Sequence, residues 1–449
     1  MSDRGLSVLA STPTGGNGRV GRLLGKLYLS ALLALFVAPL DNYLFRWGLL
    51  PLRPTILFAL GFAPVAAMAL LRWRKAGLPL ADPADAGSSN ALLIAAYAYV
   101  TAVYLLWTLL PEATPPGDGA DILRVYGLVN LLAATWCARA GLRQEDLRFV
   151  LLPAFMVLVA TMGIDVLEPG TFSLDGYRAA GIAENSNLAG FSVVLITAAM
   201  VAYDRPRLVD MGLLAICAAT IGTTFSRSVL LLLGLLLGIW CGAMLLWACR
   251  SSTGARVGFT SAAGTVAAAA VLLAVGIANG DVLRWVENKR VTTLLATDGP
   301  ESLLASSDRA RCARYSLDAL PGHWWLGRGT GYTRSLEMGP HNMVLEQWVS
   351  NGVPGVLGLA ALLGAGAAAA WRRRSAAAAA VVALLAAECL FSHNLLDERA
   401  PLLVLGLVMG VTRRAGSGWG TCLAQRAHGH HGQEGQGGDR HRAEKDPGE

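Results

Sequence analysis

Uninterrupted apolar runs constrain this chain more than any other feature. Residues 23–40, 49–71, 91–110 and 229–249 each approach or exceed the ~20 residues with which a helix crosses ~30 Å of hydrocarbon. A backbone in lipid must satisfy its own hydrogen bonds, so these runs are predicted to be helices. Only 15% of the residues are charged and 54% are hydrophobic, whereas soluble domains have roughly a quarter charged residues. The chain is therefore predicted to be an all-α, polytopic membrane protein.

About twelve transmembrane helices account for the apolar runs. The predicted spans are 22–40, 49–71, 90–110, 121–138, 148–167, 187–203, 208–223, 228–249, 257–278, 343–370, 376–394 and 399–412. The resulting organisation is a cytoplasmic segment over 1–21, helices one to nine over 22–278, a large loop over 279–342, helices ten to twelve over 343–412, and a tail over 413–449. The tail is rich in Gly, His and charge, which predicts disorder.

Basic residues at the helix ends predict the orientation, because cytoplasmic ends carry an excess of Lys and Arg. They recur at alternate ends of the spans, from Arg22 and Lys26 to Arg413 and Arg414, whereas the loop 111–120 has none. Both termini are therefore predicted to be cytoplasmic. The net charge of +6 does not indicate nucleic-acid binding, because these residues lie at helix ends rather than along one stripe. A lone extracytoplasmic cysteine, Cys312, implies no disulfide framework.

The large loop is predicted to contain short helices and to have a function, since long structureless loops are uncommon. The spacing in its second half indicates an amphipathic helix on the membrane surface. One face would carry Arg311, Arg314 and Asp318, and another Cys312, Tyr315 and Ala319.

Three extracytoplasmic motifs carry candidate chemistry. They are Arg178 with Asn185 and Asn187, then Arg227, then His341-Asn342. Arginines on one membrane face can bind a phosphate or diphosphate through charge-assisted hydrogen bonds. A neutral histidine, with an ordinary pKa of ~6.5, can accept a proton from an attacking hydroxyl. Together they fit displacement at a sugar carbon with a lipid diphosphate leaving, for which fixed guanidinium groups suffice without a metal or cofactor. Taken alone, Arg227 also fits a helix-end anchor at the headgroups.

Other motifs are weaker. The glycine-rich segment 327–331 follows no strand and lies outside the predicted cytoplasm, which argues against nucleotide binding. His393-Asn394, near Asp397 and Glu398, fits a polar helix cap better than an acceptor site.

Together these residues resemble the O-antigen ligase/polymerase superfamily of bacterial membrane glycosyltransferases. That family has an arginine-and-asparagine stretch, a Ser-Arg motif and a large periplasmic loop that ends in His-Asn. Here these motifs are Arg178 to Asn187, Ser226-Arg227, and the loop from Arg311 through 327–331 to His341-Asn342. The resemblance covers about 175–370 by motif and the whole chain by topology.

The resemblance implies metal-independent transfer of a glycan from undecaprenyl diphosphate at the periplasmic face of the inner membrane, with a sugar hydroxyl of lipid A–core as acceptor. His341 would be the general base, and Arg178 and Arg227 would bind the diphosphate. The implied substrate contacts are Arg311, Arg314, Asn342, Asn185 and Asn187. Asn342 could orient His341, and the asparagines of the first motif could shape their loop. Three positions depart from the family pattern, namely Ser186, Ser350 and Tyr315.

Other functions remain open. An O-antigen or exopolysaccharide polymerase, or a protein O-oligosaccharyltransferase, would differ only in the acceptor. A secondary transporter would be expected to have repeated halves and interrupted helices with polar groups at mid-membrane. A non-catalytic scaffold for envelope assembly would tolerate loss of His341 or Arg227.

Overall fold

A computed structural model describes most of the chain. The described residues are 17–76, 87–110, 113, 120–139, 142–173, 178–204, 207–224, 226–250, 264, 308–336, 339–392 and 395–411. Helices are the regular elements of these ranges, which confirms the all-α prediction for them. Some predictions lie outside the described residues, namely the span 257–278 apart from one residue, the loop up to 307, the tail, and the pair His393-Asn394.

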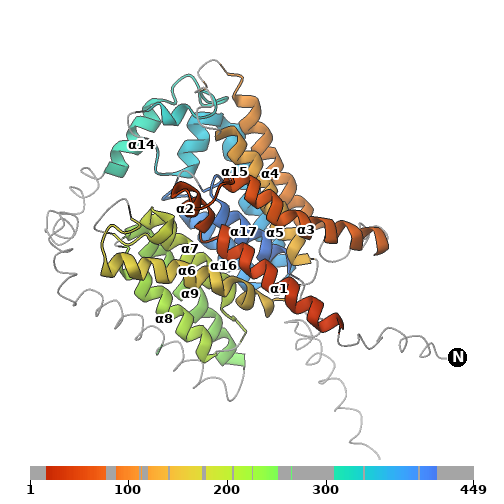
Figure 1. The fold of residues 1–449 in the computed structure, drawn as a ribbon. Helices are drawn as coiled ribbons and strands as arrows, with labels where there is room; N and C mark the ends of the chain where they lie inside the picture. Colours follow the sequence, from red (N-terminus) through yellow and green to blue (C-terminus); the bar gives the residue numbers. More distant parts are fainter. Residues whose placement is uncertain are drawn as a thin grey trace, which may run out of the picture. The chain divides into compact units, whose positions relative to one another are not determined.

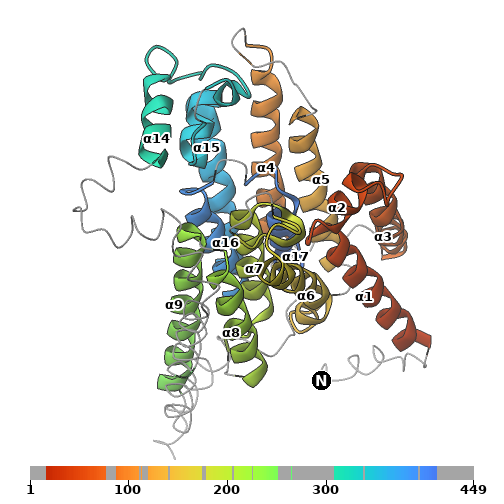
Figure 2. The same ribbon diagram turned by 60° about the vertical axis from the view of Figure 1, so that its left-hand side comes forward.

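Each predicted span other than 257–278 falls on a helix (Figure 1 and Figure 2). The helices are α1 Asn17–Phe36, α2 Leu40–Arg46, α3 Pro54–Ala76, α4 Gly87–Trp107, α5 Ala120–Arg139, α6 Asp146–Leu167, α7 Ser186–Met200, α8 Leu208–Gly222, α9 Arg227–Arg250, α14 Asp308–Asp318, α15 Met343–Arg372, α16 Ala376–Glu388 and α17 Arg399–Gly410, with 3-10 turns η2 Gly181–Ala183 and η3 Tyr332–Arg334.

Length and composition mark several of these helices as membrane spans. Among the described residues, four helices are long and apolar enough to cross a bilayer, namely α4, α6, α9 and α15. A fifth span results if α1 and α2, which meet at an angle of 56°, are counted together. Helices α7, α8, α16 and α17 are apolar but shorter. The chain is thus consistent with a multi-pass membrane protein, whereas the number of twelve spans stays a prediction.

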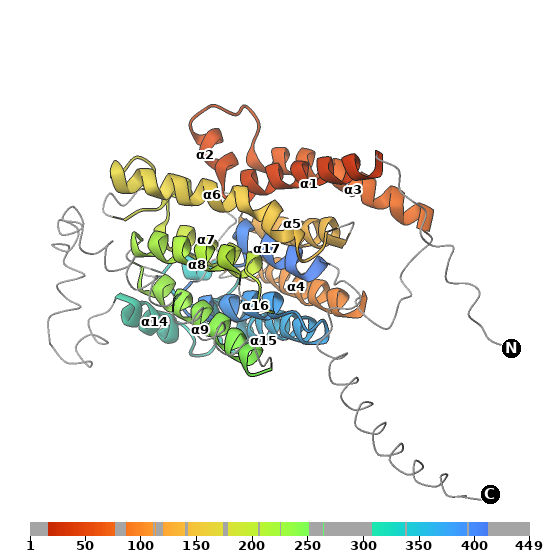
Figure 3. The same cartoon turned by 90° about the horizontal axis from the view of Figure 1, so that it is seen from below.

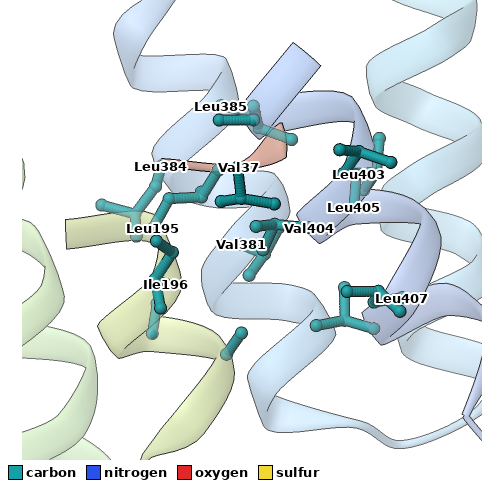
Figure 4. Close-up of a cluster of buried hydrophobic side chains, with 14 of the residues drawn as sticks. Val37, Leu195, Ile196, Val381, Leu384, Leu385, Leu403, Val404, Leu405 and Leu407 are labelled. Atoms are coloured by element: carbon teal, nitrogen blue, oxygen red, sulfur yellow. The ribbon is translucent and has the colours of Figure 1, made fainter. Parts of the chain in front are cut away.

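Three of the short helices, α7, α16 and α17, are mostly buried and contribute much of the core. Every residue of α17 after Arg399 is buried, and Figure 3 shows α17 between α5 and α16. Small residues permit this packing, because a Cβ added at Gly406 would lie 2.8 Å from the Leu131 carbonyl oxygen of α5. Figure 4 shows aliphatic side chains of α7, α16 and α17 meeting around Val37 at the end of α1.

Polar contacts join helix ends that the pattern of basic residues places on the same side of the membrane. At the predicted cytoplasmic ends, Lys26 of α1 pairs with Asp146 of α6 at 2.6 Å. The Arg373 guanidinium, just after α15, donates to Asn90 Oδ1 of α4 at 2.7 Å. These bonds support the predicted alternation of ends.

The bend between α1 and α2 joins ends on the predicted extracytoplasmic side. Asp41, at the start of α2, forms a two-point ion pair with Arg399, at the start of α17, in which Nη2 donates to Oδ1 at 2.8 Å. Asp41 is fully buried, so the pair replaces the water that this carboxylate loses on folding. Arg46, at the other end of α2, pairs with Glu184 beside η2. α2 therefore connects the loop of the first motif to α17.

The predicted span over 343–370 falls on the candidate span α15, but this helix is broken at Gly352, with φ +63° and ψ −156°, which the sequence analysis did not foresee. The glycine-rich segment 327–331 lies against the break. The Arg328 and Gly329 amides donate to the carbonyls of Val349 and Ser350, each at 2.9 Å. These bonds satisfy carbonyls that the interrupted helix cannot.

Candidate functional site

The first two motifs meet through hydrogen bonds from Arg178. Its Nε donates to the Thr224 carbonyl at 2.9 Å, and its Nη2 donates to Asn187 Oδ1 at 2.9 Å. The next amide, of Ala179, donates to the Thr223 carbonyl at 3.2 Å. Two of the five guanidinium N–H groups therefore fix the plane of Arg178 between the start of α7 and the turn that joins α8 to α9.

A buried carboxylate organises the loop that carries Arg178. Asp165, near the end of α6, is 1% exposed. Its Oδ1 accepts from the Phe172 amide at 2.7 Å, and its Oδ2 accepts from the Gly181 amide at 2.7 Å. Gly181 has a φ of +55° and lies close against α6. The sequence analysis missed Asp165, although an acidic residue inside an apolar span is itself a signal of function.

Asn185 and Asn187 differ in their contacts. Asn185 is the N-cap of α7, and its Oδ1 accepts from the amides of Asn187 and Leu188 at 2.9 and 3.3 Å. Asn187 accepts from Arg178. The prediction that these residues shape the loop therefore has a physical basis, since one begins the helix and the other orients the guanidinium.

Arg227 is the first residue of α9 and is exposed. The preceding turn is held by its own hydroxyls, because the Ser226 amide donates to Thr224 Oγ1 at 3.2 Å and the Ser226 and Ser228 hydroxyls lie 3.1 Å apart. Thr224 thus links the two arginine segments, because its carbonyl accepts from Arg178 and it lies three residues before Arg227.

His341 and Asn342 precede α15. His341 is exposed, and Asn342 is the N-cap, whose Oδ1 accepts from the amides of Val344 and Leu345 at 2.9 and 3.1 Å. The side-chain Nδ2 of Asn342 donates to the Leu390 carbonyl at 3.5 Å. These contacts make Asn342 a cap that ties the start of α15 to the end of α16. The path from His341 to the arginines runs through α16, which packs against both α7 and α9.

Buried polar side chains continue from His341 into α15. Glu346 is 7% exposed, and its carboxylate accepts from Gln347 Nε2 at 2.9 Å and from the Thr333 hydroxyl at 3.4 Å. Asn351 Nδ2 donates to Gln347 Oε1 at 2.9 Å. This network joins η3 to the helix that His341 precedes, and sequence reasoning did not identify it.

Arg311 and Arg314 lie on α14, which packs against α15 (Figure 2). Both arginines are exposed, whereas Cys312 and Ser316 are buried. The predicted amphipathic helix is therefore present, but Tyr315 lies on its exposed side with 38% of its surface accessible. The buried stripe follows positions four residues apart because it faces α15.

A second acidic group lies before α17. Burial, together with the charge of the neighbouring Asp397, raises the pKa of the Glu398 carboxyl to about 7, against the lowering effect of Arg399. A carboxyl with such a pKa can exchange protons near neutrality.

Within the described ranges, no group of three or more His, Cys, Asp or Glu side chains is placed to hold a metal ion. The structure thus joins the segments of Arg178 and Arg227 by hydrogen bonds, whereas His341 precedes another helix, α15, and one site for all three stays a prediction. Comparison with protein-family models and with curated proteins gave no match for the chain.

Proposed function

We propose that this protein is a glycosyltransferase of the O-antigen ligase type. It would transfer a glycan from undecaprenyl diphosphate to a sugar hydroxyl of lipid A–core at the periplasmic face of the bacterial inner membrane. The observation that carries the proposal is the hydrogen bond from Arg178 to Thr224, three residues before Arg227. It brings together the arginine motifs that the resemblance assigns to the diphosphate.

The reaction would exchange one bond at the anomeric carbon. The bond from this carbon to the diphosphate oxygen breaks, and its electron pair leaves with undecaprenyl diphosphate. The acceptor oxygen forms the new bond, and its proton passes to the His341 imidazole. A guanidinium group that is already oriented, as at Arg178, stabilises the departing charge without reorganising. The exposure of His341 suits an acceptor as large as a core oligosaccharide.

A polymerase or a protein O-oligosaccharyltransferase would use the same residues with another acceptor. The proposed chemistry is the same for all of these functions, so only the product of the reaction distinguishes them.

A secondary transporter is the candidate of another class, and the break in α15 favours it most. Transporter sites form where helices are interrupted near the bilayer midplane. The break at Gly352 lies instead against the segment 327–331, which is bonded to the end of α4, since Thr330 Oγ1 donates to the Tyr104 carbonyl at 2.6 Å. Tyr104 is near the last residue of the candidate span Asn90–Trp107. The break in α15 therefore lies near the edge of the candidate span, whereas a transporter site would lie near its middle.

Purified protein, supplied with a lipid-diphosphate glycan and lipid A–core, tests the proposal through the rate of transfer. Arg178→Lys and Arg227→Lys should each lower the rate about a hundredfold, because an ammonium cannot reproduce the guanidinium fork. Arg334→Lys, at an exposed arginine of η3, is the matched control and should keep the wild-type rate. Equal rates for all three variants would remove the diphosphate role of the two arginines.

A further inference from the structure

Three consecutive large apolar side chains are exposed in the loop before α15. Trp324, Trp325 and Leu326, here called the 324–326 turn, have 57%, 69% and 56% of their surface accessible. Monomeric soluble surfaces rarely present such a contiguous patch, which marks a binding surface.

Hydrogen bonds hold the backbone of the 324–326 turn while its three side chains are exposed. The Trp324 carbonyl accepts from Trp348 Nε1 at 3.2 Å. The Trp325 carbonyl accepts from the Val353 amide at 3.1 Å, and the Leu326 carbonyl accepts from Trp107 Nε1. The exposure is thus built into the fold by bonds to α4 and α15.

These bonds also give the level of the turn relative to the candidate spans. Trp107 is the last residue of the candidate span of α4, Asn90–Trp107. Val353 is the first residue of α15 after the break, and the helix continues to Arg372, about twenty residues or ~30 Å later. At the far end, Arg373 bonds Asn90. Two adjacent helices of about one bilayer thickness therefore begin and end at matching levels, and the turn lies at one of those levels.

The chemistry around the turn fits the boundary between hydrocarbon and headgroups. Trp is enriched there, since its ring is apolar and its N–H is polar. Leu109, just after α4, is 81% exposed and extends the apolar surface. A surface hollow of ≈ 330 Å³ beside the turn is lined by Leu110 and Trp325 together with the polar side chains of His323 and Arg328. Arg328 is engaged within the loop, since its Nε donates to the Ala319 carbonyl at 2.6 Å.

We propose that the 324–326 turn inserts into the extracytoplasmic interface of the bilayer and fixes the height of residues 308–351 above the hydrocarbon. The partner is the lipid surface itself. This inference does not depend on the glycosyltransferase proposal, because it concerns the level of the loop and not its chemistry.

Spin labels on the full-length protein test the inference. Trp324→Cys and Trp325→Cys are labelled in a Cys241→Ser/Cys249→Ser/Cys422→Ser background, in lipid nanodiscs. Ser335→Cys is the matched control, because Ser335 is exposed and follows η3, which bonds Glu346 of α15 six residues before the break. Power saturation then compares collisions with O₂, which partitions into lipid, and with water-soluble nickel-EDDA. Labels at 324 and 325 should collide mainly with O₂, and the label at 335 mainly with nickel-EDDA. Unchanged thermal unfolding verifies that each variant folds.

Two results would overturn the inference. Labels at 324 and 325 that meet nickel-EDDA as often as the label at 335 would place the turn in water. Labels shielded from both reagents, with dipolar broadening between copies, would assign the surface to a second copy of the chain. Transfer activity is not read in this experiment, so its outcome is separate from that of the proposed function.

Discussion

Gly352 offers the sharpest test of how α15 is built. Its backbone, with φ +63° and ψ −156°, lies in a region that only glycine adopts readily. A Cβ there would lie 2.6 Å from the Gly327 amide nitrogen. Gly352→Ala therefore adds backbone strain of ~1–3 kcal/mol to overpacking of ~1–3 kcal/mol. We expect a loss of about 2–6 kcal/mol, a large share of a typical folding free energy of ~5–15 kcal/mol.

The assay is equilibrium unfolding in lipid–detergent mixtures, followed by tryptophan emission. Gly364→Ala is the matched control, because Gly364 lies in the same helix and a Cβ there would meet nothing within 4 Å. It should be neutral or stabilising by up to about 1 kcal/mol. Gly327→Ala combined with Gly352→Ala should cost less than the sum of the single changes, because the two glycines lie against each other and one displacement of the two segments accommodates both methyl groups. Equal stability of Gly352→Ala and Gly364→Ala would refute the break in α15.

Three further predictions concern the candidate site. Asn187→Ala should lower the rate of transfer, by less than Arg178→Lys does, with little change in stability, whereas Asn185→Ala should cost ~1 kcal/mol as a lost N-cap; equal unfolding midpoints would contradict this assignment. Asp165→Asn should destabilise by ~1.5–3 kcal/mol, because one amide oxygen cannot replace a carboxylate that bonds several backbone amides; unfolding curves measure it, and a wild-type curve would count against it. The Glu398 carboxyl, with its pKa raised to about 7, keeps its proton in the folded state after the unfolded state has lost it. Stability should therefore fall as the pH rises from about 4.5 to 7, and Glu398→Gln should flatten that slope, as thermal unfolding against pH would show.

The helices were predictable because a lipid-facing backbone leaves few choices. Apolar length located α4, α6 and α9 within a few residues. Contacts such as Lys26 with Asp146 support the predicted alternation of the helix ends. Both depend on local composition, which the sequence displays directly.

The break in α15 was not predictable in the same way. Gly352 and Pro354 interrupt an apolar run, but each is tolerated inside membrane helices. The break requires the backbone of residues 325–329, which is distant in sequence. The prediction that the segment 327–331 is not a nucleotide loop stays a prediction, and the structural role of its glycines depends on contacts that periodicity does not encode.

The candidate site shows the same division. Arg178, Arg227 and His341 were selected by residue type and motif order. Asp165 and Thr224 hold the loop of Arg178 and the Arg178 guanidinium. Asp165 could have been found from its charge inside an apolar span, whereas Thr224 acts through its backbone carbonyl, and its role becomes visible only once the loops are folded.

The central claim is tested most directly by product analysis with wild-type protein and His341→Ala. Both receive undecaprenyl-diphosphate glycan and lipid A–core in the presence of EDTA. The account predicts glycan on the core lipid with the wild-type protein only. Lengthening of the lipid-linked glycan without transfer to core would replace the ligase assignment with a polymerase. Equal transfer by His341→Ala, or no product from folded wild-type protein with competent substrates, would contradict the account.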